Sequence, residues 1–130
     1  MAVLISAMLA LPALASNCEV IRRMDAYAGT KVVPQDATCT TFLTETGKTG
    51  ASCYWVFDFR DPKARAFAAD LSGTLRACRD GASLKEDQRV NHPDSYDLQS
   101  LRTSEGIYSI SIKDKGALNQ TFVFLRLDPN

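Results

Sequence analysis

The sequence contains a single histidine, His92, and no excess of charge of either sign. One imidazole excludes the His-rich sites in which proteins bind zinc or copper. The 15 basic and 15 acidic side chains cancel, whereas nucleic-acid-binding proteins and proteins of anionic membrane surfaces carry a basic excess. We therefore expect no metal, no cofactor and no nucleic-acid partner.

The motifs of common catalytic sites are also missing. The chain has no C-x-x-C, which argues against a redox motif or a zinc knuckle, and no G-x-S-x-G. Gly47-Lys48-Thr49 looks like the end of a phosphate-binding loop, but Phe42 stands where that motif needs its first glycine. We interpret residues 47–50 as a hairpin turn instead and assign no catalytic residue.

Long apolar runs are absent as well. Residues 2–11 are apolar apart from Ser6, but this run is too short to cross a bilayer, which takes about 20 residues. Ala13-Leu14-Ala15 follows, with the A-x-A form of a signal-peptide cleavage site. We expect a signal peptide over 1–15, export to the periplasm or the medium, and no membrane insertion after cleavage. A buried N-terminal helix is the alternative.

The remaining residues, 16–130, have the length of one domain. An even number of cysteines in a small exported protein predicts two disulfides. Spacing alone leaves three pairings open. The cysteines are Cys18, Cys39, Cys53 and Cys78.

The expected secondary structure favours one of these pairings. Residues 53–60 are rich in aromatic and β-branched side chains and predict a strand. Asp61-Pro62 then predicts the start of a helix over 62–79, whose apolar stripe includes Cys78. A strand of roughly 23 Å and a helix of roughly 24 Å that turns back along it bring Cys78 beside Cys53. We therefore predict the disulfides Cys53–Cys78 and Cys18–Cys39.

The rest of the chain predicts mostly strands. We expect a helix over 17–28, strands over 38–44, 107–113 and 119–127, a helix stop at Gly81, a short helix from Ser83 and a turn over 114–117. Residues 96–102 fit either a strand or a helical turn. The last strand is apolar on both faces, which predicts a central position. The fold class is therefore α+β: a mainly antiparallel sheet with two helices on one face, stapled by two disulfides.

One polar segment, residues 89–102, breaks the alternation of core and solvent positions. It holds His92, Asp94, Tyr96 and Asp97. Binding residues concentrate in such segments of a rigid scaffold, and tyrosine is a frequent interface anchor. We expect these four residues to contact a protein partner. In the alternative interpretation, Tyr96 and Leu98 turn inward as an edge element, and the segment only closes the sheet.

The expected function is therefore that of a small exported, non-enzymatic domain that binds another macromolecule. Its support is the small size, the two disulfides, the neutral charge and the lack of a convergent catalytic set. The alternative is a small hydrolase or lyase that uses carboxylates, with Asp58, Asp94 or Asp97 as acid and base. A ligand carrier would need a cavity beside Trp55 and Phe57. We expect these two rings to pack in the core instead and to leave no such cavity.

Overall fold

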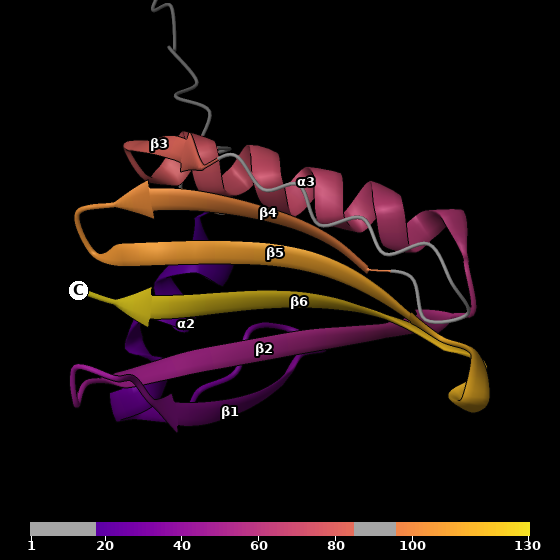
Figure 1. Ribbon diagram of the computed structural model, residues 1–130, viewed down its shortest axis with the longest axis horizontal. Helices are drawn as coiled ribbons and strands as arrows, with labels where there is room; N and C mark the ends of the chain where they lie inside the picture. Colours follow the sequence, from indigo (N-terminus) through magenta and orange to yellow (C-terminus); the bar gives the residue numbers. More distant parts are fainter. Residues whose placement is uncertain (1–17, 85–95) are drawn as a thin grey trace, which may run out of the picture.

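The computed structural model describes residues 18–84 and 96–130. These residues form two α-helices and a six-stranded antiparallel sheet (Figure 1), which confirms the predicted α+β class. The helices are α2 (Glu19–Thr30) and α3 (Pro62–Cys78). The strands are β1 (Thr38–Leu43), β2 (Thr49–Asp58), β3 (Gly81–Leu84), β4 (Tyr96–Thr103), β5 (Gly106–Lys115) and β6 (Gln120–Pro129), and a 3-10 turn, η1 (Gly116–Leu118), precedes β6.

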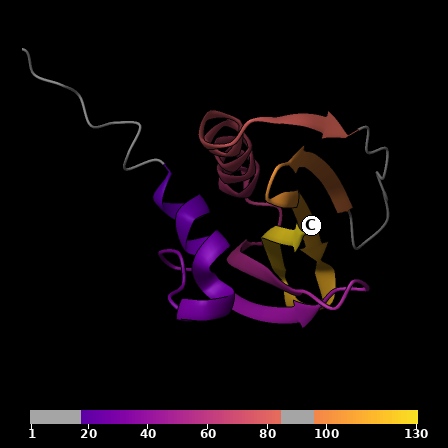
Figure 2. The same ribbon diagram turned by 90° about the vertical axis from the view of Figure 1, so that its left-hand side faces the viewer.

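The strands lie in the order β1-β2-β6-β5-β4-β3, and every neighbouring pair is antiparallel. The last strand, β6, is central, as its two apolar faces predict. Both helices lie on the same side of the sheet (Figure 2). The strand order makes β1 and β3 the two edges of the sheet. Residues 96–102, which fitted two alternatives, belong to strand β4.

The first hairpin turns earlier than predicted. The Thr44 amide donates to the Lys48 carbonyl at 2.8 Å, so the loop is residues 45–47 rather than 47–50. Gly47 has φ +78°, the left-handed conformation that such three-residue loops require and that glycine adopts without strain. Strand β2 therefore begins at Thr49.

The helices bury an apolar core against alternate residues of the strands. Helix α3 begins as predicted, because the Asp61 carboxylate accepts the Lys63 amide at 2.9 Å and caps the helix. The Trp55 ring lies 4.9 Å from the ring of Phe67 in α3, so the space beside Trp55 is filled by a core side chain, as expected. The buried side chains include Ile21, Met24 and Tyr27 from α2, Ala64, Ala68, Leu71 and Leu75 from α3, and Cys53, Trp55, Leu101, Tyr108, Ile110, Val123, Leu125 and Leu127 from the strands.

The predicted disulfide pairing is wrong: the bonds are Cys18–Cys78 and Cys39–Cys53. Helix α3 does not turn back along β2. It starts against β2 at Phe67 and crosses the sheet, so that Ser72 reaches Gln99 of β4 at 3.1 Å. Its last residue therefore ends near the start of α2, where Cys18 lies.

Three features from the end of α3 onward also differ from those predicted. Gly81 does not end the helix in a left-handed turn. The helix ends at Cys78, and the following residue, Arg79, is extended. Gly81 instead starts β3, where a Cβ atom would lie 2.4 Å from the Arg102 carbonyl oxygen. No short helix starts at Ser83, because Ser83 also belongs to β3 and pairs with Leu101 of β4. The turn expected over 114–117 begins only at Gly116, after β5 has ended.

Candidate functional site

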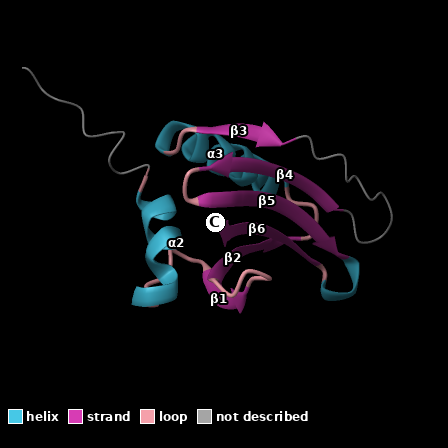
Figure 3. Cartoon of the chain, turned by 60° about the vertical axis from the view of Figure 1, so that its left-hand side comes forward, coloured by secondary structure: helices cyan, strands magenta, loops and turns pink. Residues whose placement is uncertain are grey.

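Three aromatic rings lie together on the sheet face that is turned away from the helices. The Tyr54 ring lies 5.5 Å from that of Phe122 and 5.6 Å from that of Phe124, and the two phenylalanines are 6.1 Å apart. All three are partly exposed. Val56 pairs with Phe122 and is 48% exposed. We call these four residues the open-face cluster; among the described residues, no helix lies over it (Figure 3).

A shallow groove of about 480 Å³ runs beside the open-face cluster. Its apolar wall is made by Phe124 and Leu98, and three serine hydroxyls line its floor. Lys113, Arg126 and Asp128 provide charge of both signs. Such a mixture of one aromatic surface with hydroxyls and charges is typical of protein-binding surfaces, where an apolar centre has a polar rim.

One pair of charges at the rim, Arg126 and Asp128, is held in place by hydrogen bonds. Arg126 forms a bidentate pair with Asp128, with both N–O distances 2.9 Å, and its guanidinium lies 4.0 Å from the centre of the Phe42 ring. An exposed pair of this kind adds little to the free energy of unfolding. It does restrict the arginine, which lowers the entropy that a partner must remove when it binds.

The structure places part of the predicted contact segment next to this groove. Tyr96 and Asp97 start β4, where they pair with Lys113 and Ile112 respectively. His92 and Asp94 lie outside the described residues. The role of all four in binding stays a prediction, and the two residues that the structure describes lie in the sheet rather than in a loop.

In the sheet, the backbone positions of Asp58 and Asp97, two candidates of the alternative enzyme hypothesis, lie far apart. Asp58 ends β2 and pairs with Gln120, whereas Asp97 belongs to β4. Strands β6 and β5 lie between them, which separates the two backbones by three strand spacings, about 14 Å. Asp94 lies outside the described residues. Within residues 18–84 and 96–130, no three His, Cys, Asp or Glu side chains form a group that could hold a metal ion.

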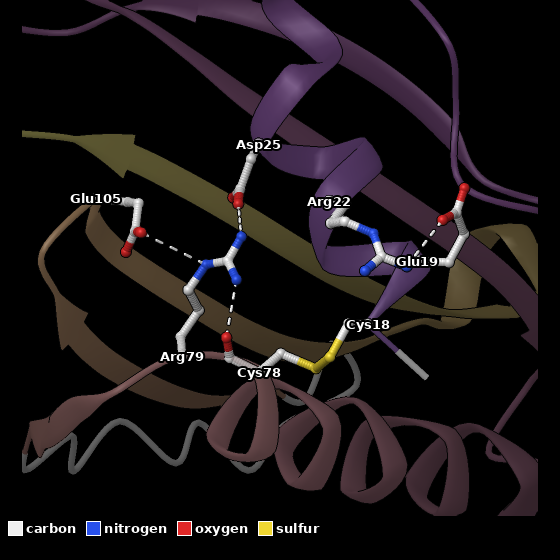
Figure 4. Close-up of a disulfide and its surroundings, with 7 residues drawn as sticks. All are labelled: Cys18, Glu19, Arg22, Asp25, Cys78, Arg79 and Glu105. Atoms are coloured by element: carbon white, nitrogen blue, oxygen red, sulfur yellow. Dashed lines mark hydrogen bonds and ion pairs between the residues drawn. A yellow bond between two sulfur atoms is a disulfide. The ribbon is translucent and has the colours of Figure 1, made fainter. Parts of the chain in front are cut away.

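A second polar group lies on the helix side, next to the Cys18–Cys78 disulfide (Figure 4). The Asp25 carboxylate of α2 accepts hydrogen bonds from Arg79 and from the Tyr108 hydroxyl of β5. The Arg79 Nε atom also lies 3.8 Å from Glu105. This network joins both helices to the sheet.

The ionisation of this network follows from its burial. Burial, followed by the hydrogen bond to Asp25, raises the pKa of the Tyr108 phenol above its ordinary value. Burial opposes the charge of Arg79, but the Asp25 carboxylate outweighs it and the pKa of Arg79 is raised. At neutral pH the group is therefore an ion pair with a neutral phenol, an arrangement that stabilises the fold rather than one poised for acid–base chemistry.

The open-face cluster was not predicted from the sequence as a site. Its signal was present in two observations: the last strand is apolar on both faces, and Tyr54 and Val56 occupy the face of β2 opposite its core residues. Together, these patterns place apolar groups on both faces of the sheet. In the described part of the chain, helices cover only one of those faces.

Comparison with known proteins adds no family assignment: no family model matches the chain, and no curated protein sequence matches it. None of the helices in the described residues has the length and apolar character needed to cross a membrane. The two disulfides are compatible with an extracellular or otherwise oxidising compartment.

Proposed function

We propose that this chain is a small exported, non-enzymatic domain that binds another protein through the open face of its sheet. The observation that carries the proposal is the open-face cluster, Tyr54, Val56, Phe122 and Phe124. Aromatic side chains that remain partly exposed beside a groove are those that contribute most to protein–protein contacts, because they bury a large area at a small cost in entropy.

The surroundings of the open-face cluster support a protein partner. The groove offers hydroxyls and charges of both signs rather than a basic surface, which suits the mixed rim of a protein interface and not a nucleic acid. The start of β4 adds Tyr96 next to Lys113. The predicted contact residues His92, Asp94, Tyr96 and Asp97 belong to the same proposal.

A pair of matched variants tests the proposed surface. Val56→Glu places a charge on the open-face cluster, whereas Leu118→Glu makes the same kind of change at η1, where Leu118 is 60% exposed. Once a partner has been isolated from the native envelope or medium, we expect Val56→Glu to weaken binding by about tenfold or more, which is about 1.4 kcal/mol. Leu118→Glu should bind as the unchanged protein does. Full affinity in Val56→Glu would place the contact elsewhere.

The predicted contact segment is tested separately. Tyr96→Ala and His92→Ala should each weaken the same complex while the far-ultraviolet circular dichroism stays unchanged. If both variants bind at full affinity, the segment 89–102 takes no part. If Tyr96→Ala instead lowers the melting temperature strongly, the tyrosine belongs to the fold and the alternative interpretation of this segment holds.

Export is the third part of the proposal. It rests on the apolar residues 2–11, on the A-x-A pattern ending at Ala15 and on the two disulfides. The protein isolated from the periplasm or the medium should begin at Ser16 by intact-mass analysis. A chain that retains Met1 would contradict it.

A further inference from the structure

Strand β1 forms one edge of the sheet and carries no charged residue and no proline from Thr38 to Leu43. Natural edge strands are commonly protected by lysine, proline or a bulge, because their unpaired amides and carbonyls can pair with another strand. The other edge strand, β3, is only Gly81–Leu84. The longer edge, which carries neither charge nor proline, is therefore β1.

The hairpin register shows which groups of β1 point outward. Thr44 and Lys48 form a hydrogen-bonded pair, and such pairs alternate along an antiparallel ladder. Phe42 and Thr40 therefore bond to β2, whereas the amides and carbonyls of Leu43, Thr41 and Cys39 point away from the sheet.

Two side-chain hydrogen bonds agree with this assignment. The Cys39 carbonyl accepts the Tyr27 hydroxyl at 3.1 Å, and the Thr41 carbonyl accepts the Thr40 hydroxyl at 3.4 Å. Both carbonyls thus take side-chain donors and not strand amides. No strand of the described residues pairs with this side of β1.

Exposed apolar side chains lie at the end of β1 and in the segment that leads into it. Leu43, at the end of β1, is 76% exposed. Val32 and Val33, in the segment that leads into β1, are 52% and 39% exposed. Within the described residues, these are three of the five large hydrophobic side chains that are exposed.

We propose that β1 pairs with β1 of a second copy of this chain, antiparallel and about a two-fold axis. A two-fold axis brings the end of one β1 to the start of the other, so Leu43 of each copy approaches the segment with Val32 and Val33 of its partner. The outward amides of each copy donate to outward carbonyls of the other. The Cys39 and Thr41 carbonyls keep their side-chain donors, because a backbone carbonyl oxygen has a second lone pair for a strand amide. The uncharged edge places no like charges together, and the zero net charge of the chain adds no overall repulsion. This surface is separate from the open-face cluster and extends beyond the proposed function.

Hydrogen exchange read against concentration tests the pairing directly. In the oxidised protein, the Thr40 and Phe42 amides should be protected at every concentration, because they bond to β2. The Thr41 and Leu43 amides should exchange freely near 1 µM and become protected toward about 1 mM, in step with the dimer fraction measured by analytical ultracentrifugation. A protein that stays monomeric at about 1 mM overturns the proposal, as does a dimer in which these two amides stay unprotected.

Edge variants provide an independent test. Thr41→Pro removes an outward amide that β2 does not use, a position where an edge strand tolerates proline, and Leu43→Lys introduces the charge that usually protects an edge. Both should raise the dissociation constant of the dimer by about tenfold or more. Thr49→Lys is the matched control, because Thr49 is exposed and lies opposite Leu43 on β2.

The controls separate this proposal from the proposed function. Thr49→Lys and Val56→Glu should both dimerise as the unchanged protein does. If Thr41→Pro and Leu43→Lys dimerise normally while they remain folded, a second copy does not use this edge. If the Thr41 and Leu43 amides become protected only when a foreign partner is added, the edge binds a different chain, and the proposal is overturned.

Discussion

The two faces of the sheet are made by alternate residues of the same strands, yet they differ in what covers them. Along β6, Val123 and Leu125 are fully buried beneath the helices. The neighbouring Phe122 and Phe124 lie on the other face, where their rings contact each other and Tyr54. The comparison shows that apolar character in a central strand serves the core on one side and leaves a partly exposed surface on the other.

The polar groups of the two faces differ in the same way. On the helix side, the Asp25 carboxylate accepts hydrogen bonds from Arg79 and from the Tyr108 hydroxyl within the fold. On the open face, Arg126 and Asp128 pair at the rim of a groove that is accessible to another molecule. A network closed on itself stabilises the fold, whereas polar groups around an apolar surface provide specificity for a partner.

The largest expected effect comes from the disulfide that holds the helix layer. Replacing Cys18 and Cys78 together with alanine should lower the free energy of unfolding by about 4 kcal/mol, because the bond closes a loop of 60 residues. The hairpin bond Cys39–Cys53 closes 14 and should cost about 3 kcal/mol. Urea unfolding of the two double variants measures both. A larger loss for the hairpin pair would show that the helix layer depends little on its tether.

The next effect compares two neighbouring residues of β6. Leu125→Ala should cost about 3 kcal/mol of unfolding free energy, because it leaves a cavity under the helices. Phe124→Ala should cost about 1 kcal/mol, since its ring is partly exposed in the folded protein. The same urea experiments provide the measurement. Equal costs would break the distinction between the two faces.

The fold class and most elements could be predicted because they depend on local patterns. The Asp61-Pro62 start of α3 and the central position of β6 follow from capping chemistry and from apolar periodicity. The direction of α3 across the sheet could not be predicted. It depends on how Phe67 and Ser72 meet different strands, which are contacts between segments far apart in the sequence.

The disulfide pairing failed for two connected reasons. The prediction assumed that the helix turns back along residues 53–60, whereas α3 crosses the sheet. The turn predicted at 47–50 would also place Thr44, and not Cys39, opposite Cys53. The true loop, residues 45–47, puts Cys39 directly opposite Cys53. With Cys39 bonded to Cys53, Cys18 and Cys78 are the remaining pair, so the register of one hairpin accounts for both disulfides.

The open-face cluster was missed because burial cannot be inferred from one strand at a time. Tyr54 alternates correctly with the core residues of β2, and that pattern predicts only that it faces away from the helices. Its contact with Phe122 depends on β6 being the neighbour of β2. That adjacency joins segments separated by the whole of α3 and three strands.

An intermediate loss of stability is expected from a change in the polar network of Asp25, Arg79 and Tyr108. Tyr108→Phe keeps the packing of the ring but removes the hydrogen bond to Asp25. We expect a loss of about 1 kcal/mol at neutral pH, measured by urea unfolding. Tyr54→Phe on the open face is the matched control and should leave the free energy of unfolding nearly unchanged.

The same substitution should change the response to alkaline pH. The pKa of Tyr108 is raised above its ordinary value of 10.0 in the folded protein, so above pH 10 the unfolded chain loses a proton that the folded chain keeps. This contribution is complete below pH 10 and is lost as the pH rises, at up to about 1.4 kcal/mol per pH unit. Tyr108→Phe should therefore lose stability less steeply above pH 10. Identical slopes would contradict the burial of the phenol.

The smallest expected effect is on the open face itself. Val56→Glu should change the free energy of unfolding by less than about 0.5 kcal/mol, because Val56 is 48% exposed and a glutamate there stays in water. Leu118→Glu changes another exposed apolar residue and provides the reference for a substitution that leaves the free energy of unfolding nearly unchanged. Thermal and urea unfolding of the isolated protein measure both variants. If Val56→Glu costs as much as Leu125→Ala, the open face is covered in the folded protein, and the cluster belongs to a second core rather than to a binding surface. If the loss is small and partner binding falls, stability and recognition are divided between the two faces of one sheet.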